Sequence, residues 1–441
     1  MRPDDNSPSP VETLAVSGRR AGRSEYTPQA LLASLVLAVT LFLLSADRLF
    51  VAVGDNKIKY GYFLIAGLWL FDPVRMSKAA AAALARVPKV TAAVILPLAI
   101  AVATSVDPKG SVWWTLWLAF DLFTVVTVYA FLKVRQFPEQ RVTDIVVGAL
   151  ALIAGFGMLQ FVSIYFFGRI IFEPQMHLDV YRINGMAGWP HFLNIFSFLL
   201  LPLVVQREKI GAVARIVVAV LLFVLVQSTA KTGWVLFVAL GALLALLNRR
   251  AFVRNYILFI VPVAVVALVL PTPSFEPGGA AVLGTEKVTR FAADLDVTDS
   301  KTSGTDRMLI NEMGIEVWKR HPWFGVGPRA FDTYVWTRFD RELPGANKLD
   351  GNRNVNAKNE NVWIELLAET GAPFTIGVAC ILAWALWVRR WAFANRTHLG
   401  AWMALVLYYA ISAQVSQNGL LTLVYAVFGI YFYARETHDA Q

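Results

Sequence analysis

Long aliphatic runs set the fold class of this chain. They are about 16 to 24 residues long, the length that a helix rising 1.5 Å per residue needs to cross about 30 Å of hydrocarbon. With 57% hydrophobic and 16% charged residues, the 441-residue chain has more apolar side chain than a soluble core can bury. A transmembrane β-barrel would show short alternating segments instead. We therefore predict an all-α, polytopic membrane protein.

About twelve runs qualify as transmembrane helices. Their expected bounds are 28–46, 60–72, 90–105, 112–132, 144–167, 189–205, 211–227, 232–247, 255–270, 371–388, 399–414 and 419–434. A polar segment at 271–370 separates the ninth run from the tenth. We expect this segment to be one large, partly helical loop between helices 1–9 (28–270) and helices 10–12 (371–434).

Lys and Arg side chains predict the orientation of the helices, because they concentrate in cytoplasmic connections. They are frequent in alternate connections, for example at 75–89 and 133–141, and scarce in the connections between these. The pattern predicts that both termini lie in the cytoplasm. These are a disordered tail at 1–27, rich in Ser, Pro and Arg, and a short tail at 435–441. The loop at 271–370 then lies outside.

The charge balance limits the classes of partner. The formal net charge is +9, yet the outside loop is slightly acidic, so the excess of cations is an orientation signal on the inside. Nucleic-acid binding has no support. A single cysteine, Cys380, excludes an intrachain disulfide and a cysteine metal site.

One motif of the outside loop is HPWFGVGPRAF at 321–331. Gly325 and Gly327 allow the backbone to turn tightly beside aromatic side chains such as Trp323. We call residues 321–330 the glycine turn. The glycines alone are weak evidence of phosphate binding, because the sequence predicts no strand before them and has no Walker lysine after them.

Two predicted helices flank the glycine turn. The stretch 302–320 is amphipathic and carries Arg307 in its first turn. The stretch KNENVWIELLAETG at 358–371 places Glu360 and Trp363 on one face of a helix that runs into the tenth transmembrane segment. We expect Glu360 to lie at the outer membrane surface.

Three more charged residues lie close to or within apolar runs, where a charge is costly and often marks a site or an ion pair. Lys231 lies between the seventh and eighth runs with almost no loop, and Asp121 lies inside the fourth run. Arg182 borders an amphipathic piece of 168–194 that we expect to lie along the membrane surface. A functional role and a structural role, such as snorkelling or ion pairing, are both open for each.

Together these residues resemble the family of bacterial O-antigen ligases and O-antigen or exopolysaccharide polymerases. Four stretches carry the resemblance, which covers about 150–390 well: RINGMAGWPHFLNIFSFLLLPL at 182–203, QSTAKTGW at 227–234, TDRMLINEMGIEVWKRHPWFGVGPRAF at 305–331 and ENVWIELLAETGAPF at 360–374. The resemblance implies a glycosyltransferase of the bacterial inner membrane. Such an enzyme takes a glycan from undecaprenyl diphosphate on the periplasmic face and passes it to an acceptor hydroxyl, without a metal or another cofactor.

The resemblance also implies roles for individual residues. Arg307 falls where the family has its arginine ahead of the glycine turn, and Lys231 falls where it often has an arginine. Glu360 falls where many members, notably the ligases, have the histidine of a His-Asn pair, and Asn361 keeps the asparagine. The implied roles are catalysis by Glu360 and Arg307, and binding of the donor diphosphate by Arg307, Lys231 and Arg182. A carboxylate in place of the histidine favours the polymerases.

Contacts with the sugars are expected from Asn361 and from Trp323, Trp363 and Tyr334, although the three aromatic side chains could equally pack within the protein. Packing is also the expected role of His321. The expected partners are the undecaprenyl-diphosphate-linked glycan, an acceptor glycan or glycolipid, membrane lipids, and a chain-length regulator or other polysaccharide-assembly proteins.

The reading favoured by the sequence is an inverting polysaccharide polymerase. A ligase that transfers the same glycan to lipid A core is the nearest alternative. A transporter or flippase of lipid-linked sugars is an alternative of another class, which predicts charged residues spread through several helices near the midplane. A purely structural membrane scaffold is the last alternative.

Overall fold

The structure is a computed structural model. It describes residues 27–46, 48–53, 56–85, 92–172, 174–177, 180–187, 190–207, 210–228, 231–269, 303–338, 361–390 and 418–439. The predicted eleventh helix at 399–414, Glu360 and most of the N-terminal tail lie outside the described residues, whereas a helix continues into the predicted C-terminal tail as far as Asp439.

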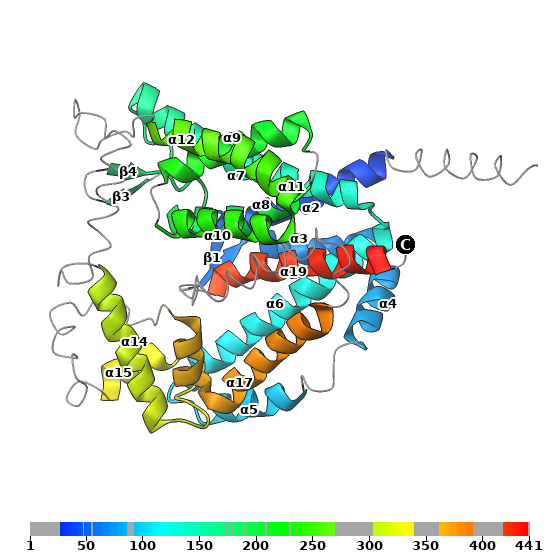
Figure 1. Ribbon diagram of the computed structural model, residues 1–441. Coiled ribbons are helices and arrows are strands. Elements are labelled where there is room, and N and C mark those ends of the chain that lie inside the picture. The colour runs from blue at the N-terminus through cyan, green and yellow to red at the C-terminus, as the bar shows by residue number, and fades with distance from the viewer. Residues whose placement is uncertain are drawn as a thin grey trace, which may run out of the picture.

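Helices make up nearly all of the described chain (Figure 1). In chain order they are α2 (Pro28–Ser45), α3 (Tyr60–Gly67), the 3-10 helix η1 (Leu68–Phe71), α4 (Pro73–Leu84), α5 (Ala92–Ala103), α6 (Pro108–Arg135), α7 (Glu139–Phe167), α8 (Pro190–Val205), α9 (Ala212–Gln227), α10 (Lys231–Leu247), α11 (Arg249–Ala251), the π-helix η3 (Phe252–Ile260), α12 (Val261–Val269), α14 (Ser303–Arg320), α15 (Phe331–Arg338), α17 (Val362–Arg390) and α19 (Asn418–Asp439). Two short antiparallel hairpins pair β1 (Phe50–Val53) with β2 (Asn56–Lys59) and β3 (Gln175–His177) with β4 (Val180–Arg182).

Several of these helices have the composition of membrane-spanning segments. Among the described residues, α2, α6, α7 and the continuous segment Arg249–Val269 are long and apolar enough to cross a membrane. Shorter apolar stretches lie in α3 with η1, α5, α8, α9, α10 and α19. The structure therefore confirms a predominantly helical chain with the character of a membrane protein, and the count of about twelve spans stays a prediction.

Within the described residues the helices pack in layers around two larger hydrophobic cores and a small third cluster between α9 and α12. In Figure 1, α7, α9, α10 and α12 lie in the upper part and α5, α6, α14, α15 and α17 in the lower part, with α19 between them. α19 packs along α6, α2 packs along α7, and α7 along α9. The larger core joins α2, α6, α7, α8, α9 and α19. The smaller core lies under the glycine turn.

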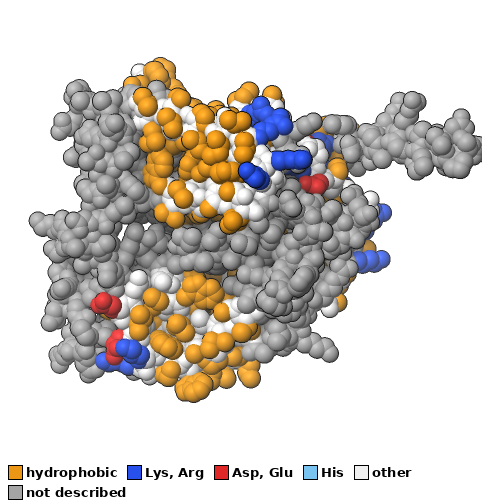
Figure 2. Space-filling view, viewed as in Figure 1, with side chains coloured by type: hydrophobic (Ala, Val, Ile, Leu, Met, Phe, Trp, Pro, Cys, Tyr) orange, Lys and Arg blue, Asp and Glu red, His pale blue; other side chains and the backbone are white. Residues whose placement is uncertain are grey.

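Hydrogen bonds tie together the helix ends that the topology places on the inside. Arg207, after α8, donates to the Glu139 carbonyl at the start of α7 at 2.9 Å. The Tyr433 hydroxyl of α19 donates to the Phe137 carbonyl, after α6, at 2.6 Å. Figure 2 shows the apolar surface of the upper helices and several Lys and Arg side chains at this end, on the right of the view. That this end faces the cytoplasm stays a prediction.

Three connections differ from the sequence reading. The inside connection after η1 forms α4, because the Asp72 carboxylate accepts a hydrogen bond from the Arg75 N–H at 3.0 Å and caps the helix. The piece expected along the membrane surface forms the β3–β4 hairpin, in which Met176 pairs with Tyr181. The outside connection after α2 forms the β1–β2 hairpin. The fold is thus not purely α-helical, since local pairing satisfies the backbone of these connections.

Asp121 has partners within the protein. Its side chain is 2% exposed and accepts a hydrogen bond from the Thr422 hydroxyl of α19 at 2.6 Å. Lys59, expected in an outside loop, is also 2% exposed and attracts Asp121 electrostatically. The Lys59 ammonium lies 3.4 Å from the Leu44 carbonyl at the C-terminal end of α2, where the helix dipole favours a cation. These contacts support the structural role for Asp121.

We predict that Asp121→Asn destabilises the protein more than Thr422→Val does. The first change removes a charge that attracts the buried Lys59 ammonium, whereas the second removes only one hydrogen bond, worth about 1 kcal/mol. Thermal unfolding of the purified protein in detergent measures both. Equal melting temperatures for the two variants would contradict the pairing.

Candidate functional site

α17 is broken where the predicted tenth span begins. Gly371 has φ +76° and ψ 177°, which lies outside the helical region. Pro373 has no N–H to donate to the Glu369 carbonyl four residues earlier. The Ala372 N–H does not bond to the Ala368 carbonyl, as it would in a continuous helix. Two carbonyl groups of α17 are therefore left without their helical partners.

The glycine turn supplies the missing partners. Val326 and Gly327 donate their N–H groups to the two free carbonyls at 3.0 and 2.8 Å. In return, the Ala372 N–H donates to the Pro322 carbonyl at 2.8 Å. The break in the helix and the glycine turn therefore satisfy each other's backbone groups.

Two glycines make this close contact possible. Gly325 has φ +64°, and a Cβ there would lie 2.3 Å from the Glu369 carbonyl oxygen. Gly327 has φ +108°, and a Cβ there would lie 1.9 Å from the Ser105 hydroxyl. The tight turn predicted at these two positions is present, and it requires glycine for conformation and for space.

The side chain of Glu369 adds a second contact with the turn. Its carboxylate, 5% exposed, accepts hydrogen bonds from the Arg329 N–H at 2.7 Å and from the Phe331 N–H, at the start of α15, at 3.3 Å. Burial raises the pKa of the Glu369 carboxyl to about 7, although both N–H groups and the charge of Arg329 act to lower it. Glu369 therefore titrates near neutral pH.

The smaller hydrophobic core joins α14 to this arrangement. Ile310, Met313 and Val317 of α14 are buried against Ala368 of α17 and apolar residues of the turn and α15. α14 and the first part of α17 therefore form one packed unit. This unit carries the backbones of two predicted site residues, Arg307 near the start of α14 and Asn361 immediately before α17.

The connection between α5 and α6, together with the first turn of α6, holds the same unit. The Ser111 hydroxyl donates to the Pro328 carbonyl of the glycine turn at 2.7 Å. The Val106 N–H donates to the Val326 carbonyl at 2.9 Å. The turn is thus fixed on one side by α17 and on the other by the α5–α6 connection.

The predicted cations lie on three different elements. Arg307 is on α14, Lys231 begins α10, and Arg182 ends β4. α14, the start of α10 and the β3–β4 hairpin all lie on the left of the molecule in Figure 1. The side chains of the three residues lie outside the described part of the chain, as does Glu360, so their convergence stays a prediction.

The predicted sugar contacts differ in exposure. Trp323 is 69% exposed, whereas Tyr334 is 6% exposed and its hydroxyl lies 2.8 Å from His321 Nε2. Burial thus favours packing for Tyr334, and His321 packs against it as expected. Trp363 is partly buried, and the Asn361 side chain accepts from the Trp363 N–H at 3.0 Å and caps α17.

The buried side-chain amide of Gln160 holds the predicted outside connection that contains Arg182. Gln160 of α7 is fully buried and accepts from the N–H groups of Asn184 and Gly185 at 2.9 and 2.7 Å. It donates to the Asn184 side chain at 2.9 Å and to the Phe172 carbonyl at 3.1 Å. Sequence reasoning missed Gln160, because its partners follow it by 12 to 25 residues in the chain.

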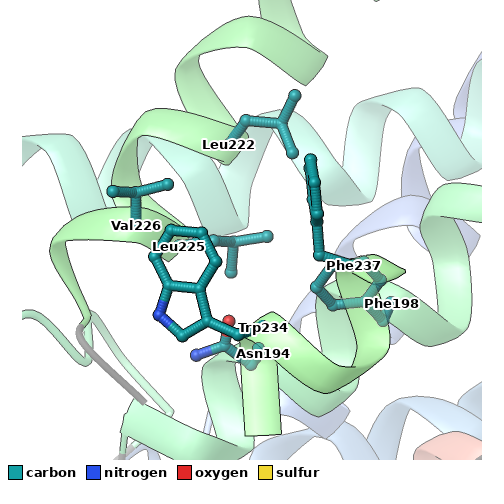
Figure 3. A pocket seen from close by; sticks show the side chains of 8 residues that line it. Asn194, Phe198, Leu222, Leu225, Val226, Trp234 and Phe237 are labelled. Atoms are coloured by element: carbon teal, nitrogen blue, oxygen red, sulfur yellow. The ribbon is translucent and has the colours of Figure 1, made fainter. Parts of the chain in front are cut away.

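A small cavity lies between α8, α9 and α10, next to the residue that begins α10 (Figure 3). Its lining is apolar except for Asn194, which donates to the Ser228 hydroxyl at 2.7 Å. The cavity volume is about 20 Å³, which is room for about one water molecule. This cavity is therefore too small to be a sugar site.

The fold and these contacts define a class: a helical membrane protein with a glycine turn held at the break of a long helix. Residues 216–379 match the family model described as O-Antigen ligase, and this part of the chain is a domain of that family. The match begins in α9 and includes α10, α14, the glycine turn and the broken part of α17. It confirms the resemblance and supports an enzyme of the glycosyltransferase type. No curated protein matches the chain.

We predict that Gly371→Ala destabilises the protein by more than about 2 kcal/mol, because the new methyl group combines a left-handed φ with a clash. Its Cβ would lie 2.2 Å from the Trp323 carbonyl oxygen. Gly155→Ala in α7 is the matched control, since nothing lies within 4 Å of its Cβ position and alanine favours a helix. Melting temperatures in detergent test the pair. A Gly371→Ala variant as stable as Gly155→Ala would contradict the proposed packing.

We predict that Glu369→Gln gains stability relative to the wild type as the pH rises from 5 to 8. The folded pKa of Glu369, about 7, is above its ordinary value of 4.5, so its contribution to stability is greatest below pH 4.5 and is lost as the pH rises through 7. The change should be about 1–3 kcal/mol.

The measurement is the difference in melting temperature between variant and wild type at each pH. Glu312→Gln, on an exposed position of α14, is the control and should show a smaller change with pH. Parallel curves for wild type and Glu369→Gln would contradict the buried position of this carboxyl group.

Proposed function

We propose that the chain is a membrane glycosyltransferase that polymerises a polysaccharide, O-antigen or exopolysaccharide, on the periplasmic face of the inner membrane. One observation carries the proposal: the O-antigen ligase domain at 216–379 contains α14, the glycine turn and the break of α17 as one packed unit. This unit holds the helix of Arg307 beside the helix that begins after Glu360 and Asn361. A fixed spacing between a cation and a proton acceptor is what transfer from a diphosphate donor needs.

The donor is an undecaprenyl-diphosphate-linked glycan. Its leaving group carries the negative charge of a diphosphate, so cations at headgroup depth stabilise the transition state. Arg307, Lys231 and Arg182 supply these cations in our proposal. Lys231 offers a point charge where an arginine would offer a bidentate fork, so we expect it to contribute less to orientation.

The transfer inverts the anomeric centre. The hydroxyl oxygen on the terminal sugar of another lipid-linked unit bonds to the anomeric carbon of the donor. The bond between that carbon and the diphosphate oxygen breaks, and undecaprenyl diphosphate leaves with the electron pair. Glu360 takes the hydroxyl proton or orients the hydroxyl, while Asn361 and Trp323 contact the sugars.

The carboxylate at position 360 is the reason to place polymerase before ligase, since the ligases notably have a histidine there. A ligase acting on lipid A core is the alternative within the class. A transporter or flippase is less well supported, because the buried Asp121 and Lys59 attract each other and bond to Thr422 and to the Leu44 carbonyl, which is a structural use of these two charges.

We predict that Glu360→Gln reduces polymer formation by about 10²-fold or more, because an amide cannot accept the proton. Chain length and yield are measured by gel electrophoresis of polysaccharide from cells that express each variant at equal level. Glu312→Gln, the same change on an exposed position, should retain full activity. Full polymer length with Glu360→Gln would remove Glu360 from the mechanism.

The phenotype of a deletion strain separates the two enzymes. Loss of a polymerase leaves single repeat units on lipopolysaccharide, whereas loss of a ligase removes O-antigen from it entirely. Movement of lipid-linked units across a bilayer without elongation, in reconstituted vesicles, would favour the transporter instead.

A further inference from the structure

Arg329 is the one exposed residue in a buried stretch of the chain. Residues 326, 327, 328, 330 and 331 are buried by the contacts with α17 and with the α5–α6 connection, and only the side chain at 329 faces outward. Because this side chain is exposed, packing does not require an arginine at this position.

The backbone of Arg329 is in a conformation that favours glycine. Its φ is +59°, and within the described residues the one other non-glycine residue with positive φ is Gln136. Gln136 follows the last residue of α6, where a left-handed residue commonly ends a helix. Arg329 follows no helix. Gly325 and Gly327 show that the same turn uses glycine at its other left-handed positions.

The conformation of Arg329 is imposed by its neighbours and not by its own side chain. The Glu369 carboxylate holds its N–H at 2.7 Å, and the Ser111 hydroxyl holds the preceding carbonyl, of Pro328, at 2.7 Å. The guanidinium group makes no hydrogen bond or ion pair with any residue that the structure describes, although its positive charge acts on the buried Glu369 carboxyl group. The positive φ of Arg329 is unfavourable, and its guanidinium group forms no hydrogen bond or ion pair within the described fold that would explain an arginine here. This combination indicates that the side chain binds a ligand.

The position of the turn indicates what that ligand is. The turn contacts Ala372, at the start of the predicted span 371–388, and Val106 and Ser111, between the predicted spans 90–105 and 112–132. Three predicted spans thus meet the outer membrane surface beside Arg329. At this depth the abundant anions are the phosphate groups of lipids, and a guanidinium group binds phosphate through paired N–H donors.

We propose that Arg329 binds a lipid phosphate group at the outer membrane surface. The phosphate can belong to the headgroup of an anionic lipid or to the diphosphate of the lipid-linked substrate, and only the second source rests on the proposed function. The three cations named for the donor do not include Arg329, so the proposal adds a fourth phosphate contact.

The test uses the full-length protein with Arg329→Gly and Arg329→Lys. Glycine removes the guanidinium group and also relieves the left-handed φ, so Arg329→Gly should melt at the wild-type temperature or above it. Binding of undecaprenyl diphosphate and of phosphatidylglycerol, each measured by native mass spectrometry against phosphatidylcholine, should weaken about tenfold for at least one of the two anionic lipids. Arg329→Lys should retain part of the binding. Arg320→Ala, which removes the same charge from the exposed end of α14, should bind like wild type.

Each outcome assigns or removes a role. Weaker binding of undecaprenyl diphosphate alone identifies the substrate as the source of the phosphate, and weaker binding of phosphatidylglycerol identifies the bilayer. Unchanged binding of both lipids by a stable Arg329→Gly variant overturns the proposal, and so does a lower melting temperature with unchanged binding. If the wild type binds phosphatidylglycerol but not undecaprenyl diphosphate, and Arg329→Gly weakens the binding of phosphatidylglycerol, the proposed function fails while the inference about Arg329 stands.

Discussion

The predicted outside face of this protein depends on an exchange of backbone hydrogen bonds at one break in α17. A helix that stops at a glycine and a proline leaves carbonyl groups without partners, which is costly where water is scarce. The glycine turn, some 40 residues earlier in the chain, donates the N–H groups that these carbonyls need. The glycine turn also requires α17, because the N–H groups of the turn would otherwise be buried without acceptors. Neither segment satisfies its backbone without the other.

Electrostatics and desolvation oppose each other at the same contact. Two N–H donors and a nearby arginine favour the ionised form of Glu369, whereas burial favours the neutral acid. The raised pKa of this carboxyl group, about 7, shows that desolvation is the larger effect. The carboxyl group remains useful in both states, because a neutral acid keeps oxygen atoms that accept hydrogen bonds. The contact can therefore persist across the pH range in which the group titrates.

The sequence predicted those features that depend on local pattern. Apolar length placed most of the helices, and amphipathic spacing placed the helix at 302–320, found as α14. The glycine spacing predicted the turn. The helix break at Gly371 has a local signal, because Pro373 lacks the N–H that would bond to the Glu369 carbonyl. The pattern of 358–371 nevertheless predicts a helix that runs without interruption into the span at 371–388.

Features that depend on distant partners were not predictable from pattern. Glu369 looks like an ordinary helix carboxylate until a turn about 40 residues away places two N–H groups against it. Lys59 appeared to lie in a loop because its partners are a helix end and a carboxylate on α6. The roles of Glu360 and Arg307 follow from family resemblance and stand as predictions about chemistry.

Buried amides explain how irregular backbone is held at the predicted outer ends of the upper helices. Gln160 satisfies the connection before α8, Asn194 binds the end of α9 through the Ser228 hydroxyl, and Gln227 donates to the Ala267 carbonyl of α12 at 3.1 Å. In lipid such groups are costly unless paired, so each pairing fixes a connection or a helix end in place. Two predicted phosphate ligands lie beside these fixed points: Arg182 precedes Asn184 by two residues, and Lys231 follows Ser228 by three. The backbone beside these two predicted ligands is thus already held in place, and a fixed backbone is one condition for a preorganised anion site.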